Sequence, residues 1–210
     1  MEMASYLAGE TWSDHPRCTN PTLALLAREV NDRVDDDHRR LLAPMVPDVV
    51  GIGTTDPLAP TTVARACALA GLDAGVTGTR AQAVGLLRCE AVFNGVTVAG
   101  EPMLSSDAEA ALAARPVERA WAERFVAAAS GAGYLAPLES PLDHHSASVI
   151  VGAAVTGLAA VPGGSARLVD LLRSAITSCR SAAAARAGDV ACDRRQRHPF
   201  PPRSDAAGAS

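Results

Sequence analysis

Lysine is absent from this chain of 210 residues, and all 19 of its basic residues are arginine. Alanine is abundant as well, and the combination indicates a GC-rich coding genome rather than a need for arginine in nucleic-acid binding. The formal net charge of −4 also lacks the positive balance that general polyanion binders carry. We therefore expect no nucleic-acid partner.

Aromatic residues are scarce, at 3% of the chain, so a buried core has to be built mainly from alanine, leucine and valine. Hydrophobic residues at 48% and charged residues at 20% are otherwise typical of a soluble globular protein. The length suits one ordinary domain or two small ones. Composition thus predicts a globular core of small aliphatic side chains.

The five cysteines are widely spaced, odd in number and without a C-x-x-C pair. This pattern does not indicate a disulfide framework. The opening residues, MEMASYLAGE, also lack the basic and apolar regions of a secretory signal peptide. We therefore expect a cytoplasmic protein with reduced thiols.

No apolar run is long enough to cross a membrane. The best candidate, ASVIVGAAVTGLAAV, spans 15 residues, and a membrane-spanning helix needs about 20. We predict a buried helix over about 146–161 and no membrane partner.

The spacing of apolar residues predicts an all-α single domain of seven or eight helices over residues 1–188. The residues from 189 to 210 are polar, proline-rich and aperiodic, which predicts a disordered tail. We expect one helix to begin at a cap formed by Asn20 and Pro21, and another over 62–70 with Gly71 as its C-cap. A third should begin at a capping box of Ser106 and Glu109. Two more are expected over 116–131, with Trp121 and Phe125 in the core, and over about 165–186.

Two short clusters could bind a metal. His15 and Cys18 have the spacing that lets two side chains share one ion, and Asp14 could orient the imidazole. Further ligands would have to come from the segment LDHH, where Asp143, His144 and His145 stand together. Zinc or iron would suit such a set. A weaker alternative makes Cys18 a nucleophile with a histidine base.

The same N-terminal stretch, WSDHPRC, also has a purely structural interpretation. Ser13 and Asp14 would form turn hydrogen bonds, and Pro16 would fix the loop. Trp12 would anchor the segment in the core, with Cys18 as a small buried residue. The two interpretations differ in whether LDHH folds back to meet this stretch.

A longer pattern runs through the N-terminal third of the chain. The motif Y-L-x-G-x-x-W-S-D-x-P-x-C-x-x-P-x-L begins at Tyr6, ends at Leu23 and is followed by Asn31–Asp32. Over residues 5–52 the chain resembles a family of uncharacterised actinobacterial helical proteins. The resemblance implies a helical fold and an intracellular setting, and it implies no activity. Family members often carry another residue at the position of His15, which counts against this histidine as a ligand.

The absence of a complete catalytic motif leads us to expect a non-enzymatic accessory or protein-interaction module, with another protein as its partner and no cofactor. The alternative is a metal-dependent enzyme that uses His15, Cys18, Asp143, His144 and His145, so the sequence leaves open whether the protein is an enzyme. A third hypothesis is a small-molecule-binding bundle. It predicts a sizeable apolar pocket beside the uncharged helix 146–161.

Overall fold

The structure is a computed structural model that describes residues 1–52, 54–76 and 78–197, with the backbone alone from residue 187 onward. Within these ranges the protein is a single all-α domain, as predicted, and its one β feature is an isolated bridge between Val96 and Pro102. The helical elements are α1 (Glu2–Leu7), α2 (Pro21–Arg33), α3 (Asp36–Arg39), the 3-10 turn η1 (Ala43–Met45), α4 (Val46–Val49), α5 (Ala59–Ala74), α6 (Thr79–Asn94), α7 (Ser106–Ala113), α8 (Pro116–Gly131), α9 (His144–Ala159) and α10 (Gly164–Arg197).

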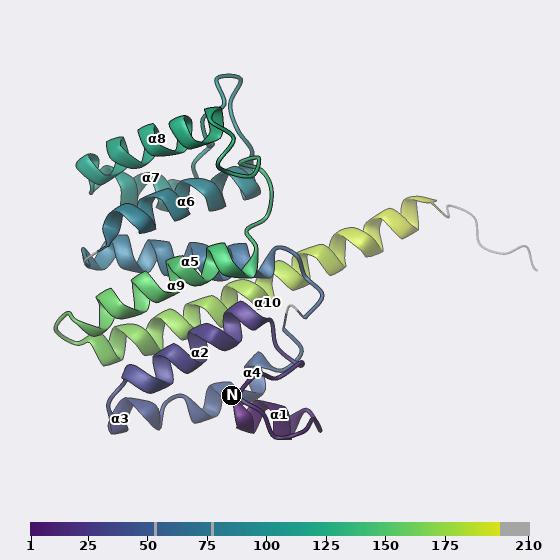
Figure 1. Ribbon diagram of the computed structural model, residues 1–210. Helices are drawn as coiled ribbons and strands as arrows, with labels where there is room; N and C mark the ends of the chain where they lie inside the picture. Colours follow the sequence, from purple (N-terminus) through teal and green to yellow (C-terminus); the bar gives the residue numbers. More distant parts are fainter. Residues whose placement is uncertain (53, 77, 198–210) are drawn as a thin grey trace, which may run out of the picture.

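Helix α5 lies in the middle of the bundle and contacts α2, α6, α7, α9 and α10. On one side of it, α6, α7 and α8 form a stack that ends at α8 (Figure 1). On the other side, α9 and α10 pack against α2. The short elements α1, α3, η1 and α4 lie beyond α2. The bundle is therefore several helices deep, with α8 at one edge.

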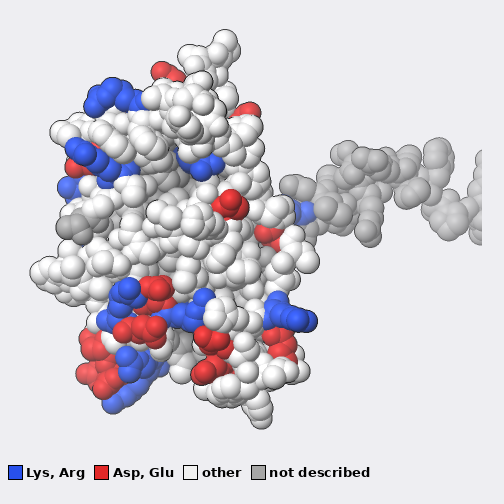
Figure 2. All heavy atoms as spheres, in the orientation of Figure 1, with Lys and Arg blue, Asp and Glu red and all other residues white. Residues whose placement is uncertain are grey.

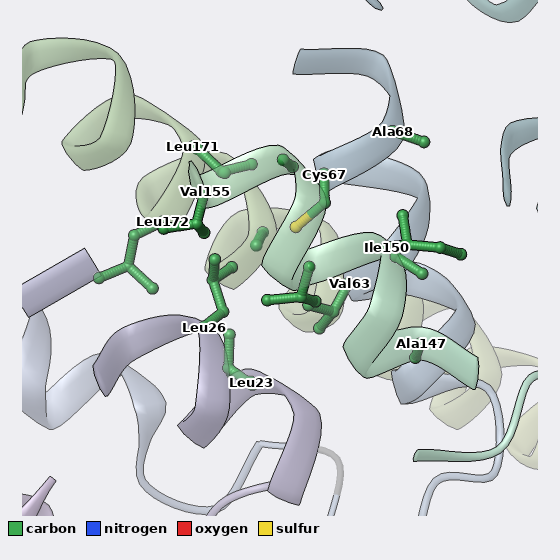
Figure 3. Close-up of a cluster of buried hydrophobic side chains, with 14 of the residues drawn as sticks. Leu23, Leu26, Val63, Cys67, Ala68, Ala147, Ile150, Val155, Leu171 and Leu172 are labelled. Atoms are coloured by element: carbon green, nitrogen blue, oxygen red, sulfur yellow. The ribbon is translucent and has the colours of Figure 1, made fainter. Parts of the chain in front are cut away.

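The core sits where α2, α5, α9 and α10 converge. Figure 3 shows Leu26 of α2, Val63 and Cys67 of α5, Val155 of α9 and Leu171 of α10 pointing toward one another. These side chains are almost fully buried, which favours folding by about 1.5–3 kcal/mol for each large aliphatic one. No aromatic residue of the described chain belongs to this buried set, so the core is aliphatic as the composition predicts.

The start of α2 follows the sequence prediction. The Asn20 side chain accepts a hydrogen bond from the backbone N–H of Thr22 at 2.9 Å, and Pro21 takes the first helical position. The predicted C-cap at Gly71 is wrong, because α5 continues to Ala74 and ends at Gly75, whose φ is 64°. Gly71 instead lies inside the helix, where a Cβ would sit 3.0 Å from Cγ of Gln82 on α6.

The capping box predicted at Ser106 and Glu109 is also wrong. Helix α7 has Ser105 as its N-cap residue, and no side chain caps it. The Ser105 hydroxyl donates to the carboxylate of Glu90 at 2.6 Å. The pattern therefore placed the cap one residue too late, and the hydroxyl of the actual N-cap residue binds a side chain of α6 instead of the backbone of α7.

Helix α10 extends to Arg197, past the predicted domain boundary at residue 188. The added segment contains alanine, arginine and glutamine, which have high helix propensity. The remainder of the predicted tail, 198–210, lies outside the described residues.

Charged side chains gather over α2 and α3, at the bottom of the view in Figure 2. Asp36 pairs with Arg39 at 2.9 Å and Asp37 with Arg40 at 3.0 Å, while Asp35 caps α3 by accepting from the N–H of His38. No helix in the described ranges is long and apolar enough to span a membrane.

Candidate functional site: a cationic apolar pocket between α6, α8 and α9

The first predicted metal cluster is arranged only in part as expected. Nδ1 of His15 lies 2.6 Å from Oδ1 of Asp14, as predicted, and this hydrogen bond lowers the pKa of Asp14. Both side chains are exposed. The Cys18 thiol lies 3.7 Å from the carbonyl oxygen of Ala4 and 3.8 Å from the hydroxyl of Thr19. The imidazole and the thiol therefore have different partners.

The three residues of the second cluster have three separate environments. Asp143 is the N-cap of α9 and accepts from the N–H of Ser146 at 2.7 Å. Nδ1 of His144 lies 2.9 Å from the hydroxyl of Thr22 at the start of α2. His145 lines a pocket on another side of α9. The segment LDHH thus does fold back to the beginning of α2, where it meets Thr22.

Among the residues that the structure describes, no group of three or more His, Cys, Asp or Glu side chains is placed to hold a metal ion. His15, Cys18, Asp143, His144 and His145 accordingly do not form the single site that the sequence suggested. Chain distance explains the failure, because sequence spacing cannot fix how two segments about 130 residues apart approach each other.

The predicted burial of Trp12 is wrong. Its side chain is 62% exposed, and its ring packs edge-on against Tyr6 with 6.2 Å between centroids. Two smaller residues hold this segment instead. The Thr19 hydroxyl donates to the carbonyl of Val49 at 2.8 Å, and the Asn20 N–H donates to the carbonyl of Ile52 at 3.0 Å.

The most favourable ligand site is a pocket of about 650 Å³ between α6, α8 and α9. One wall is a pair of stacked rings from α8, Trp121 and Phe125, with centroids 5.1 Å apart and planes 11° from parallel. The Arg80 guanidinium lies 5.2 Å from the centre of the Trp121 ring, within cation–π range. Aliphatic side chains make up most of the remaining walls: Val84, Leu135, Leu142, Val149 and Ile150.

Helices α6 and α9 approach closely beside this pocket. Gly85 makes the approach possible, because a Cβ there would lie 2.6 Å from Cδ1 of Ile150. The uncharged helix predicted over 146–161 supplies Ser146, Val149 and Ile150 to the lining. The pocket therefore lies where the small-molecule hypothesis predicts one.

The ionisable side chains that line this pocket are all basic. Arg80, Arg88 and His145 line it, and no aspartate or glutamate does. Asp143 lies within their field: the hydrogen bond from the Ser146 N–H is the main cause of its lowered pKa, with smaller contributions from His145 and Arg88. The pocket therefore combines apolar walls with two arginines on its α6 side.

Sequence reasoning predicted a pocket beside the helix over 146–161 but missed its α8 wall, because it assigned Trp121 and Phe125 to the core. Phe125 is 43% exposed, since α8 lies at the edge of the bundle and packs mainly on α6 and α7. A usable signal was present in α6, where Arg80, Val84 and Arg88 recur at four-residue steps and share a helix face.

A larger cleft of about 1020 Å³ lies between α5, α7 and α10, and the charged side chains at its α5–α7 wall, Arg65 and Asp107, pair with each other. Glu90 is fully buried beside it and accepts from Nε of Arg65 at 2.6 Å, from the Ser105 N–H at 2.7 Å and from Asn94 at 2.9 Å. Asp107 also pairs with Arg65. Burial alone would lower the pKa of Arg65, but these hydrogen bonds outweigh it and raise that pKa.

Comparisons of the chain with protein families, with curated proteins and with solved structures found no match.

Proposed function

We propose that the protein is a non-enzymatic accessory module that binds a small apolar molecule in the pocket between α6, α8 and α9. One observation carries this proposal: a pocket of about 650 Å³ whose walls are aromatic and aliphatic. That volume falls within the range of about 300–1,000 Å³ typical of small-molecule sites. The larger cleft is a poorer candidate, because Arg65 and Asp107 at its wall already satisfy each other.

The proposal predicts binding of an uncharged apolar probe. N-phenyl-1-naphthylamine, a neutral dye that becomes fluorescent in apolar surroundings, should give a saturable rise in fluorescence with the full-length protein. Phe125→Ser removes one ring of the stacked pair, and the lost apolar contact should reduce the affinity for the dye by about tenfold. Because Phe125 is partly exposed, the variant is expected to fold.

Val117→Ser is the matched control, since Val117 is an exposed apolar residue of the same helix that does not line the pocket. Its affinity for the dye should equal that of the wild type. No saturable binding, or equal loss in both variants, would contradict the proposed function.

A second candidate function is the docking of another protein, which the sequence predicts. The observation that favours it is the N-terminal surface formed by Met3, Tyr6, Leu7 and Trp12, each more than half exposed. Exposed aromatic residues are enriched where proteins bind one another. The cysteines whose side chains the structure describes, at 18, 67, 89 and 179, are all free, which supports a reducing, cytoplasmic setting for either function.

The docking function is tested by affinity purification of tagged protein from its host. A specific partner should be retained by the wild type and by Phe125→Ser, and lost with the double variant Tyr6→Ser, Trp12→Ser. A partner retained equally by all three proteins would show that this surface does not dock it.

A further inference from the structure

Two arginines of the pocket have no counter-ion among the residues that the structure describes. Arg80 and Arg88 stand two turns apart on α6, and neither is within ion-pair distance of a described carboxylate. Nε of Arg88 is buried and has no hydrogen-bond partner among the described atoms. Elsewhere the guanidinium groups of Arg65 and Arg119 are each held by two carboxylates. Other arginines, such as Arg124 and Arg167, also form no ion pair among the described residues, so the feature that sets this pocket apart is the buried Nε of Arg88 that has no partner.

The surroundings make this charge effective. The aliphatic and aromatic walls lower the dielectric around the half-buried Arg88, so its charge acts on a bound anion more strongly than a fully solvated cation would. Asp143, whose carboxyl is influenced by the charges of Arg88 and His145, caps α9 by accepting a hydrogen bond from the N–H of Ser146. The pocket therefore offers charge without an internal partner to neutralise it fully.

We propose that the pocket selects an aromatic carboxylate, an inference that rests on the proposed binding function. The ligand's ring packs against the exposed Phe125 and extends the parallel stack that Phe125 makes with Trp121. Its carboxylate turns toward α6, where the planar guanidinium of Arg88 donates to it. Arg80, held over the Trp121 ring, adds a second positive charge.

A matched pair of ligands tests this on the unmodified protein. 2-Naphthoate and 2-naphthamide share ring, size and shape, and differ in the negative charge. Isothermal titration calorimetry should show 2-naphthoate binding at least about tenfold more tightly, since a hydrogen bond to a charged group adds about 1.5–3 kcal/mol. Equal affinities, or binding of neither ligand, would overturn the carboxylate inference whatever the variants show.

Arg88→Met keeps an unbranched apolar stem and removes the charged guanidinium, so the preference for 2-naphthoate should fall to about twofold or less. Arg124→Met is the matched control, because Arg124 is an exposed residue of α8 outside the pocket, and it should keep the full preference. If Arg88→Met retains the preference, Arg88 is not the anchor and the inference fails. Should that variant not fold by circular dichroism, Arg80→Met takes its place, with a reduced preference expected and an unchanged one contradictory.

The two proposals fail in different ways. Loss of anion preference with retained binding of the neutral dye leaves the proposed function intact and removes only the ligand class. Failure of the dye and of both naphthalene ligands removes the binding function itself.

Discussion

Glu90 is the residue on which the largest single loss of stability is expected. Its fully buried carboxylate joins α5, α6 and the start of α7 through Arg65, Asn94 and Ser105. Glu90→Ala leaves these donors without their acceptor, which should cost about 3–5 kcal/mol. Urea denaturation followed by circular dichroism measures the free energy of unfolding.

Glu109→Ala is the comparison for this effect, because Glu109 pairs with Arg119 at the surface. A surface pair contributes about 0–1 kcal/mol, so this variant should stay close to the wild type. Similar losses for the two variants would show that the Glu90 network adds nothing to stability beyond an ordinary ion pair.

Residues whose role depends on near neighbours in the chain were predictable. Asn20 and Pro21 start α2 as expected, because a cap needs only a side-chain oxygen and the next two N–H groups. Trp12 and Phe125 were not, since periodicity marks a side chain as apolar without saying whether another element covers it. Glu90 was missed for the same reason: its partners lie on other elements.

At the scale of the element, two glycines make a matched test of helix packing. Gly85 in α6 faces Ile150 at a distance that leaves no room for a Cβ, whereas Gly152 in α9 has no atom within 4 Å of that position. Gly85→Ala should lose about 1–3 kcal/mol through overpacking. Gly152→Ala should gain about 0.5–1 kcal/mol from helix propensity.

Thermal and urea unfolding of both variants measures the difference. Ile150→Val removes Cδ1, the atom nearest to a Cβ at Gly85, and leaves Cγ1 at 2.9 Å, so the loss should shrink in part when Gly85→Ala is made in that background. An unchanged loss in the double variant would place the strain somewhere other than the α6–α9 contact.

The N-cap of α9 should make stability depend on acid. The Ser146 N–H donates to Asp143 and holds the pKa of this carboxyl below its ordinary 3.8. The unfolded chain therefore binds this proton more readily, and the stability that Asp143 adds above pH 3.8 is lost as the pH falls through the lowered pKa.

Asp143→Asn keeps a capping oxygen and removes the titration, so its free energy of unfolding should fall less steeply than that of the wild type between about pH 5 and pH 2. Asp143→Ala should instead lose about 1 kcal/mol at neutral pH, because the cap itself is gone. Parallel acid profiles for the wild type and Asp143→Asn would contradict the role given to this carboxylate. Urea titrations at a series of pH values provide the data.

The elements themselves were largely predictable, and their ends less so. Helix α8 occupies the predicted 116–131 because Pro116 begins it and the apolar spacing continues to Gly131. Helix α5 passes through Gly71, since packing against Gln82 of α6 outweighs the tendency of glycine to end a helix. Tertiary contact decided the boundary where local propensity was weak.

For the whole molecule, the all-α domain and its aliphatic core followed from composition and periodicity, whereas the aromatic wall and the charges of the pocket did not. A core requires only that apolar faces meet, which their spacing ensures. A pocket depends on where the faces fail to meet, and at α8 this is set by its place at the edge of the bundle. The predicted metal site failed for a related reason, because His15 pairs with Asp14 whereas His145 lines the pocket between α6, α8 and α9.

Labelling of the cysteine thiols during unfolding can show whether this domain unfolds as one cooperative unit. Cys67 and Cys89 are fully buried, and burial raises both thiol pKa values, that of Cys89 to about 12. Burial likewise raises the pKa of Cys179 on α10 to about 11, while Cys18 is half-buried. In a Cys192→Ser background, a thiol reagent at pH 8 should label Cys18 in the folded protein and the other three only on opening.

Because α10 packs on α2, α5 and α9 in one continuous core, opening of α10 alone would expose the inner faces of all three. We therefore expect Cys67, Cys89 and Cys179 to share one labelling midpoint in urea, equal to the midpoint of helix loss by circular dichroism. Mass spectrometry of peptides assigns the label to each cysteine. Labelling of Cys179 at clearly lower urea than Cys67 would mean that α10 detaches before the bundle unfolds, and that the domain is two cooperative units rather than one.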